Sequence, residues 1–484
     1  MRRPGAGGLI LIVMLAAGYF VARGPMWNAD SRIFLTASIV DRGRLDIDPF
    51  ASGTGDIAAY HGHFFSDKAP GTSLFAIPAY LVLKYTLLGG KPYAAIMAAP
   101  PDQRVDFFPR YLLALLFSAL PTGVVAALLR AVYLRLGVRR LWADGLALTY
   151  GLGTIALPFA RVFFGHQLAA ALVFGAFVVL LRVRLGELAP RYVAAAGALA
   201  GCAIITEYPA ALLVALLVAY AANTSADRRR VLAALALGAA PALLVGALYN
   251  TLAFGGPLSQ GYAHLAATSA FRAGQAQGFM GITRPHLEAI WQTTFGPYRG
   301  MFLLSPVLLL AVPGFVWLRR RPEWRAEWWL WLAAVVGYAL FTVSYFEWDG
   351  GFSIGSRHFL PALPFLMLPL AELTRPERRR AWRVALVALA GASVVIVGLA
   401  NAVGPLFDPV YRSPLSDLVL PSLVGRAPGA PASALSPLRA QLDNNWGMVL
   451  RLPGVVQLVP LWGAIALVAG RRWQRLRQTE PSGA

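Results

Sequence analysis

Charged side chains are scarce in this chain. Asp, Glu, Lys and Arg make up 14% of its 484 residues, whereas a soluble domain carries roughly 25%. Apolar runs of about 16 to 25 residues recur along the whole length, and each can cross or nearly cross a bilayer. The scarcity of charge and the apolar runs exclude an ordinary soluble domain and predict a membrane protein.

Cysteine is also rare in this chain, and the common nucleotide-binding and hydrolase motifs are absent from the sequence. Cys202 is the single cysteine, so no intramolecular disulfide can form, and we interpret this thiol as part of the core. There is no P-loop, dinucleotide fingerprint, zinc-protease motif or Gly-x-Ser-x-Gly sequence. A substrate should therefore be activated by something other than a nucleotide, and a lipid phosphate fits a site at a membrane edge.

Positive charge is in excess, with a formal net charge of +20. In a soluble protein this would suggest nucleic acid. Here the arginines gather in short connections between apolar runs, which is the positive-inside pattern of membrane proteins. We therefore predict no nucleic-acid partner. The arginine-rich connections lie at 130–140, 182–191, 228–230, 319–325, 378–383 and 471–477.

Hydropathy and the arginine pattern predict about 12 crossings, within a range of about 11 to 14, with both termini in the cytoplasm. Residues 72–90 are also apolar, and they either cross the membrane or form a re-entrant or interfacial helix. The predicted spans are 8–23, 109–131, 141–160, 166–184, 192–206, 208–224, 231–254, 301–318, 328–346, 357–373, 384–400 and 456–470.

This topology sorts the polar residues onto the outer face. The long polar segments 24–71, 255–300 and 401–455 face outward, together with all six histidines. We expect one transmembrane body over 1–400, irregular structure in the 401–455 loop, and a last span with a basic cytoplasmic tail over 456–484. Any chemistry should therefore take place on the outer face.

Asp30 follows the first apolar run and precedes an amphipathic stretch, 33–40. A carboxylate at this edge can act as a general base that takes a proton from an acceptor. It can equally cap the helix that starts beside it. The two roles are compatible, and the local sequence leaves both open.

The segment 61–71 reads HGHFFSDKAPG. Lys68 is one of only three lysines, against 40 arginines, which suggests a particular need for an ammonium group that can bind phosphate. His61, His63 and Asp67 could hold a divalent metal. A solvated polar turn explains the same residues more simply, so metal dependence stays open.

Further polar groups stand at the ends of later apolar runs. Asn250 and Tyr262 form a polar shoulder, and Arg299 lies where a lipid phosphate would lie, although interfacial anchoring explains these residues as well. Glu207 and His166 occupy outer turns, and we interpret them as groups that support the site.

The short outer connection over 347–358 contains two acids, a tryptophan, an arginine and a histidine. Glu347, Asp349 and His358 can bind sugar hydroxyls, and Arg357 can grip a phosphate with its planar fork. A hairpin turn with an internal acid–arginine pair would explain the same residues.

In this order the motifs resemble the GT-C superfamily of polyprenyl-phosphate-dependent glycosyltransferases. The similarity is closer to the branch of protein mannosyltransferases and aminoarabinose transferases of bacterial membranes. Two features depart from that pattern: Ser31 follows Asp30 where the family often has Glu, and Ala69 interrupts the usual Lys-Pro-Pro. The resemblance covers most of 8–375 and is carried by Asp30, 61–71, 250–262, 295–306 and 351–364.

The resemblance implies a fold and a reaction. The fold would be an all-α polytopic membrane body with juxtamembrane helices on its outer face. The reaction would be inverting transfer of a sugar from undecaprenyl or decaprenyl phosphate to a glycolipid, a cell-envelope glycan or a protein. It would take place on the outer face of a bacterial inner membrane, with Asp30 as general base.

The resemblance also implies roles for the other residues. Lys68, Arg299 and Arg357 would hold the donor phosphate. A divalent Mg or Mn ion serves some members, and its need here stays open. Two alternatives remain, a flippase or transporter of lipid-linked sugars and a polysaccharide polymerase or ligase. The residues expected to contact sugar or acceptor are His61, His63, Asp67, Asn250, Tyr262, Glu347, Asp349 and His358.

Overall fold

The computed structural model describes residues 6–21, 26–99, 107–404, 406–423, 445–452 and 454–479. Helices account for 72% of the structure, which confirms the all-α prediction. The α-helices follow one another from the N-terminal region to the C-terminal region. They are α1 (Gly7–Tyr19), α2 (Trp27–Arg42), α3 (Gly71–Thr86), α4 (Tyr93–Ala98), α5 (Phe107–Ala114), α6 (Leu120–Arg135), α7 (Arg140–Leu152), α8 (Ala156–Ala160), α9 (Gly165–Arg184), α10 (Val193–Thr206), α11 (Ala210–Thr224), α12 (Arg228–Phe254), α13 (Arg272–Gln275), α14 (Leu287–Thr294), α15 (Met301–Leu304), α16 (Ala311–Leu318), α17 (Arg325–Ser344), α18 (Leu363–Met367), α19 (Arg380–Val403), α20 (Leu420–Leu423), α22 (Trp446–Val449) and α23 (Val459–Thr479).

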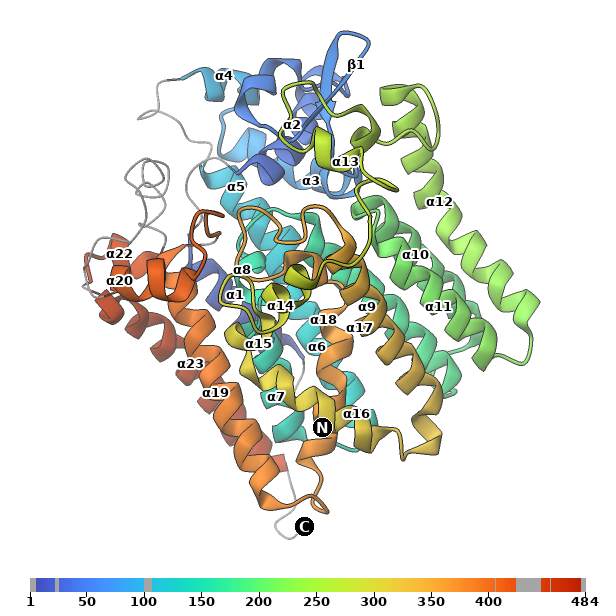
Figure 1. Ribbon diagram of the computed structural model, residues 1–484, viewed down its shortest axis with the longest axis vertical. Coiled ribbons are helices and arrows are strands. Elements are labelled where there is room, and N and C mark those ends of the chain that lie inside the picture. The colour runs from blue at the N-terminus through green and yellow to red at the C-terminus, as the bar shows by residue number, and fades with distance from the viewer. Residues whose placement is uncertain are drawn as a thin grey trace.

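Five helical stretches in the described part of the chain are long and apolar enough to cross a membrane. They agree with the predicted membrane protein, and shorter apolar helices lie between them. The longer helices run between the two ends of the molecule (Figure 1). The five stretches are Phe107–Arg135, Gly165–Arg184, Arg228–Phe254, Pro322–Ser344 and Arg380–Val403.

Helix α9 lies in the core of this bundle. It packs against α6 and α10, and its aromatic residues contact those of later helices. The ring of Phe174 lies 5.4 Å from that of Phe365, and the ring of Phe177 lies 6.1 Å from that of Trp331. This packing fixes the position of α9, and therefore of the polar residues at its first turn.

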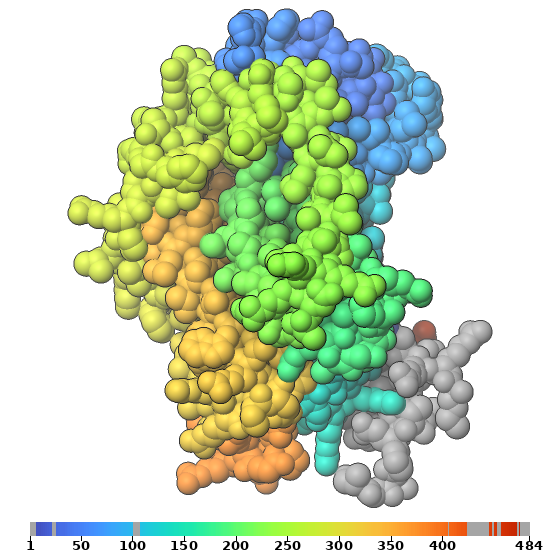
Figure 2. Space-filling model, turned by 90° about the vertical axis from the view of Figure 1, so that its right-hand side faces the viewer, coloured from blue at the N-terminus to red at the C-terminus, as the bar shows by residue number. Residues whose placement is uncertain are grey.

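The segments 26–71 and 255–300, which the sequence predicts to face outward, meet at one end of the molecule. There α2 and α3 lie beside the hairpin of β1 (Ile57–Tyr60) and β2 (His63–Ser66), with α13 close by (Figure 1). The two-residue turn at His61 and Gly62 has positive φ at both positions, 49° and 81°, as a tight hairpin turn requires. Figure 2 shows the blue N-terminal segment and the yellow-green 255–300 segment together at this end.

The second outer segment is joined to the hairpin by backbone contacts. Ala58 pairs with Leu265 in an isolated bridge, and the Ala266 N–H donates to the Ile57 carbonyl at 3.1 Å. Segments about 200 positions apart in the chain are thus held as one layer, named the outer layer after its predicted orientation, in which the candidate site lies.

The apolar stretch 72–90, whose crossing the sequence leaves open, forms α3 and the turn that follows it. Helix α3 packs chiefly against α2. Near its end Lys84 pairs with Asp41 of α2 at 2.8 Å, and Pro78 interrupts the backbone hydrogen bonding inside the helix. These contacts fit a helix that lies with α2 in the outer layer.

Three of the arginine-rich connections, 130–140, 319–325 and 378–383, lie close together. Glu372 pairs with Arg321 at 3.2 Å, with Arg375 at 3.1 Å and with Arg378 at 3.5 Å. Arg321 also donates to the Leu136 carbonyl at 3.1 Å. These contacts join three connections that lie far apart in the chain.

Two local predictions need correction. The predicted span 141–160 is broken after α7, because Gly153 and Thr154 leave the helix before α8 begins. The loop 401–455 was expected to be irregular, but its described part contains a helical stretch over 415–423 and the short helix α22. Residues 424–444 of that loop lie outside the described part.

Candidate functional site

A cavity of about 290 Å³ lies in the outer layer. Its lining combines two kinds of side chain from segments far apart in the chain. The charged and polar members are Asn28, Asp67, Lys68, His166, Glu207, Gln260, Gln275, Glu347, Arg357 and His358. The aromatic and apolar members are Tyr208, Pro209, Tyr262, Leu265, Phe271, Phe279, Met280, Ile282, Tyr338, Phe341, Tyr345, Phe346 and Pro361.

Lys68 is buried between two carboxylates. Its Nζ lies 3.0 Å from Asp56 Oδ2 and 3.1 Å from Asp67 Oδ2. The rings of Tyr262 and Phe271 lie 5.3 Å and 5.9 Å from the same ammonium. Although burial opposes the charge, the two carboxylates raise the pKa of Lys68 well above its usual value. Lys68 therefore stays protonated, and the protein itself balances its charge.

The carboxyl group of Asp67 is buried, and one of its oxygens is available to a ligand. Its side chain is 1% exposed, and among the described residues its Oδ1 has no hydrogen-bond partner. Burial and the neighbouring carboxylate of Asp56 outweigh the attraction of Lys68 and raise the pKa of Asp67 to about 7. A carboxyl group with this pKa can accept a proton at neutral pH.

Arg32 and Glu207 form a buried ion pair beside the cavity. Arg32 Nη2 lies 2.6 Å from Glu207 Oε1, and the same oxygen lies 3.0 Å from His166 Nδ1. Arg32 also donates to Asn28 Oδ1 at 3.1 Å and to the Ala69 carbonyl at 3.2 Å. Sequence reasoning missed Arg32. The signal was its position four residues after Asn28, on one face of α2.

Glu347, Arg357 and His358 line the cavity from the last outer connection. Arg357 Nη2 lies 3.4 Å from Glu347 Oε1, and His358 Nε2 lies 3.1 Å from the Glu347 carbonyl oxygen. Burial raises the pKa of Glu347 despite the nearby guanidinium. Arg357 Nε is buried with no hydrogen-bond partner among the described residues. A donor of this kind can bind the oxygen of an anion.

Asp30 does not line this cavity. Its carboxylate lines a second, much smaller cavity of about 20 Å³, together with Arg110 and Arg161. Asn28 lines the large cavity instead, because residues two apart on a helix point in nearly opposite directions. Asp30 Oδ2 accepts the Met26 N–H at 2.7 Å, and Oδ1 lies 3.3 Å from Arg110 Nη1. Helix α2 begins at Trp27 with Met26 as its N-cap residue, so Asp30 lies inside the first turn, and the prediction that it caps a helix starting beside it is wrong. Its carboxylate instead accepts the N–H of the N-cap residue.

Arg299 and Asp349 hold the last outer connection together. Arg299 is fully buried and donates to the carbonyls of Asp349 at 3.0 Å and Ser353 at 2.7 Å. Asp349 accepts the Tyr298 hydroxyl at 2.8 Å. Neither residue lines the large cavity, and these bonds occupy donors that the sequence assigns to a lipid phosphate.

Asn250 supports the cavity from behind. Its Nδ2 donates to the Pro257 carbonyl at 3.2 Å, and its Oδ1 accepts the hydroxyl of the lining residue Tyr208 at 3.4 Å. Tyr262, in contrast, lines the cavity directly.

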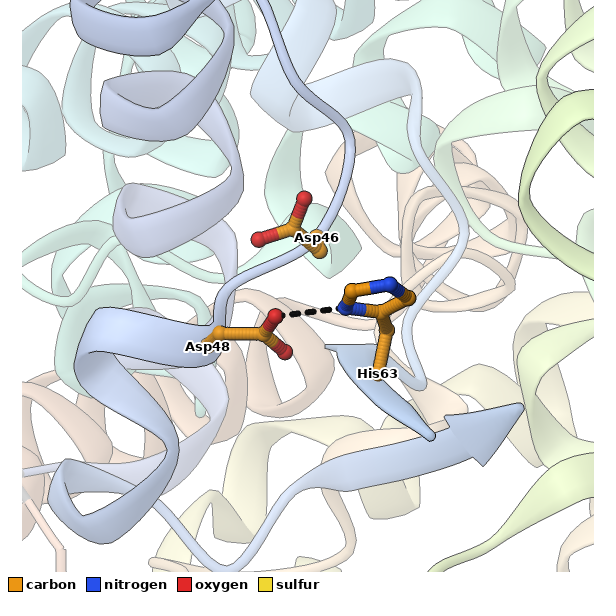
Figure 3. Close-up of side chains that lie close together, drawn as sticks. All are labelled: Asp46, Asp48 and His63. Atoms are coloured by element: carbon orange, nitrogen blue, oxygen red, sulfur yellow. Dashed lines mark hydrogen bonds and ion pairs between the residues drawn. The ribbon is translucent and has the colours of Figure 1, made fainter. Parts of the chain in front are cut away.

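The two hairpin histidines lie away from the cavity. His61 is exposed at the turn, and His63 Nδ1 lies 2.7 Å from Asp48 Oδ2 (Figure 3). Asp46, Asp48 and His63 form the single cluster of three metal-ligand side chains among the described residues, with ligand atoms within 4.8 Å of one another. Asp46, however, already pairs with Arg42 at 2.9 Å and with Arg44.

Removal of divalent metal should therefore leave the stability of this protein unchanged. Two arginines balance Asp46, and the ammonium of Lys68 occupies the place between Asp56 and Asp67 where a cation would bind. The measurement is the temperature of thermal unfolding in detergent before and after treatment with a chelator. A loss that added Mg²⁺ or Mn²⁺ restores would contradict this expectation.

Comparison with known proteins assigns no family to this chain. No protein-family model matches this sequence, and no curated protein sequence matches it. The case for a function therefore rests on the motifs along the chain and on the residues that surround the large cavity.

Proposed function

We propose that this protein is a membrane glycosyltransferase that moves a sugar from a polyprenyl-phosphate donor to an acceptor in the large cavity. The outer layer would face the periplasmic side of a bacterial inner membrane. The observation that supports the proposal is the mixed lining of the cavity. Charged groups suited to a sugar and a phosphate stand next to aromatic and apolar groups suited to a lipid chain.

The proposed reaction is a single displacement. The acceptor oxygen attacks the anomeric carbon, the bond from that carbon to the phosphate oxygen breaks, and the polyprenyl phosphate leaves with the electron pair. The acceptor proton passes to a carboxylate. Arg357 is the best placed group to bind the phosphate, because its Nε is unpaired among the described residues. Lys68 is less suited to this role, because Asp56 and Asp67 already balance its charge.

Two carboxylates are candidates for the base. The sequence assigns this role to Asp30, whereas the geometry favours Asp67. Asp67 lines the large cavity, has an oxygen without a partner among the described residues, and has a pKa raised to about 7. Proton uptake by Asp67 would balance the negative charge that develops on the departing phosphate.

Transfer from defined donors tests the function. Purified protein in proteoliposomes would be supplied with radiolabelled sugars on undecaprenyl or decaprenyl phosphate and with membrane extracts as the source of acceptor. We expect wild type to transfer label and Arg357→Met to bind donor more weakly. Movement of the glycolipid across the bilayer without transfer would contradict the proposal and favour a flippase.

The transfer rate should depend on pH in the direction set by Asp67. A base works only when deprotonated, and the pKa of Asp67 lies at about 7. The rate at low donor concentration should therefore rise about tenfold per pH unit below 7 and level off above it. The measurement is kcat/KM from pH 5 to 9. A rate that falls as the pH rises through 7 would exclude Asp67 as the base.

A further inference from the structure

His166 stands at the first turn of α9 and lines the large cavity. Its Nδ1 lies 3.0 Å from Glu207 Oε1. Its Nε2 is buried and has no hydrogen-bond partner among the described residues. A buried polar atom without a partner is costly, and its place at a cavity points to a ligand that supplies the missing bond.

The state of Glu207 decides which nitrogen of His166 carries the proton. Burial alone would raise the pKa of Glu207, but the charge of Arg32 and the hydrogen bond from His166 lower it to about 2. The carboxylate is therefore ionised and can only accept hydrogen bonds. His166 must donate to it from Nδ1, so in the neutral ring Nε2 carries a lone pair.

The backbone at the start of α9 leaves room for Glu207 beside His166. A Cβ at Gly165 would lie 2.4 Å from Glu207 Oε1 and 2.9 Å from Thr72 Oγ1. Any larger residue would push Glu207 away from the helix. Glycine at this position, Arg32 on α2 and Glu207 at the end of α10 together hold the imidazole in one orientation.

We propose that His166 is a specificity-determining residue that accepts a hydrogen bond from one hydroxyl of the bound sugar through Nε2. Glu207 and Arg32 are positioning residues that act through it. A lone-pair nitrogen binds a hydroxyl and not a phosphate oxygen, so the sugar lies toward α9 and its phosphate toward Arg357. This assignment rests on the proposed function, since it takes the ligand of the cavity to be a glycosyl lipid.

Binding of matched donors tests the inference. The probes are undecaprenyl-phosphate hexoses and pentoses, each with its monodeoxy analogues, titrated against wild type, His166→Phe and His166→Gln in nanodiscs. We expect wild type to bind one deoxy analogue about 10- to 100-fold more weakly than its parent, because that analogue leaves Nε2 unpaired. His166→Phe should bind the pair equally, whereas His166→Gln, which keeps an acceptor, should retain part of the difference.

The control variant is His286→Phe, because His286 is exposed and lies away from the cavity. It should discriminate as wild type does. Thermal unfolding of each variant separates loss of fold from loss of the hydrogen bond.

A second readout is the imidazole tautomer of His166, measured in nitrogen-15 spectra. The signal of His166 is identified among those of the six histidines by comparison with His166→Gln. A proton on Nε2 would overturn the inference.

The outcomes separate this inference from the proposed function. If wild type and His166→Phe distinguish the parent donor from its deoxy analogue equally well, the role of His166 is overturned and the proposed function is not. The same holds if wild type does not distinguish the two donors. Discrimination that depends on His166, without sugar transfer in the same preparation, overturns the glycosyltransferase and leaves His166 as a sugar contact. Failure to bind any of the glycolipids overturns both.

Discussion

Replacing Asp67 with asparagine should lower sugar transfer by about 10²- to 10⁴-fold, the usual contribution of a general base. Asparagine has nearly the same size and keeps a hydrogen-bonding oxygen, but it cannot take the proton of the acceptor. Because the donor phosphate is expected to bind to Arg357, donor affinity should change little. The measurement is single-turnover transfer at saturating donor, together with equilibrium binding of the donor.

Asp30→Asn provides the matched comparison, because it makes the same chemical change in the small second cavity. Asp30 bonds to the Met26 N–H and lies beside Arg110, so this variant should lose stability and retain most of its transfer per folded molecule. The opposite result, with transfer abolished in Asp30→Asn and retained in Asp67→Asn, would return the role of base to Asp30.

Replacing Lys68 with methionine should destabilise the protein by about 3–5 kcal/mol at pH 8, as is typical when one partner of a buried ion pair is removed. Methionine preserves most of the apolar stem but leaves Asp56 and Asp67 buried without their shared cation. The measurement is the free energy of unfolding in detergent, obtained from a denaturant titration.

The loss of stability in Lys68→Met should depend on pH, because folding changes the pKa of Asp67. Without Lys68 the pKa of Asp67 should rise beyond its present value of about 7, while the unfolded carboxyl keeps its ordinary low value. The folded variant then holds a proton that the unfolded chain has released, so the added instability should grow above pH 7 and shrink below it. A loss that grows as the pH falls would contradict the pairing.

Lys91→Met is the control for this experiment. Lys91 is exposed, and substitutions at such positions usually change stability by less than about 0.5 kcal/mol. Equal losses in Lys68→Met and Lys91→Met would show that the buried pairing of Lys68 contributes nothing particular.

Much of the candidate site can be predicted because its residues follow apolar runs. Asp67, Lys68, Tyr262, Glu347 and Arg357 all stand where a hydrophobic stretch begins or ends, and in the structure they line one cavity. Helices that run side by side in a bundle bring their ends together. Residues at these ends can therefore meet in one site although they lie far apart in the chain.

Other residues could not be placed in this way. Arg32 is 175 positions from Glu207, and its surroundings resemble an ordinary amphipathic helix. Asp56 lies directly before β1, and its pairing with Lys68 depends on how the hairpin folds back toward the start of α3. The bonds of Arg299 to three carbonyls of the last connection likewise depend on the tertiary fold.

The sequence by itself determined that the chain is helical and apolar, and it named several polar residues that line the large cavity, among them Asp67, Glu347 and Arg357. Composition and hydropathy carry this information, because they act over whole segments. Only the tertiary structure decided that Asn28 and not Asp30 faces the large cavity, and that Lys68 lies between two carboxylates. The rotation of a helix about its axis and the pairing of distant charges depend on packing, which no local pattern records.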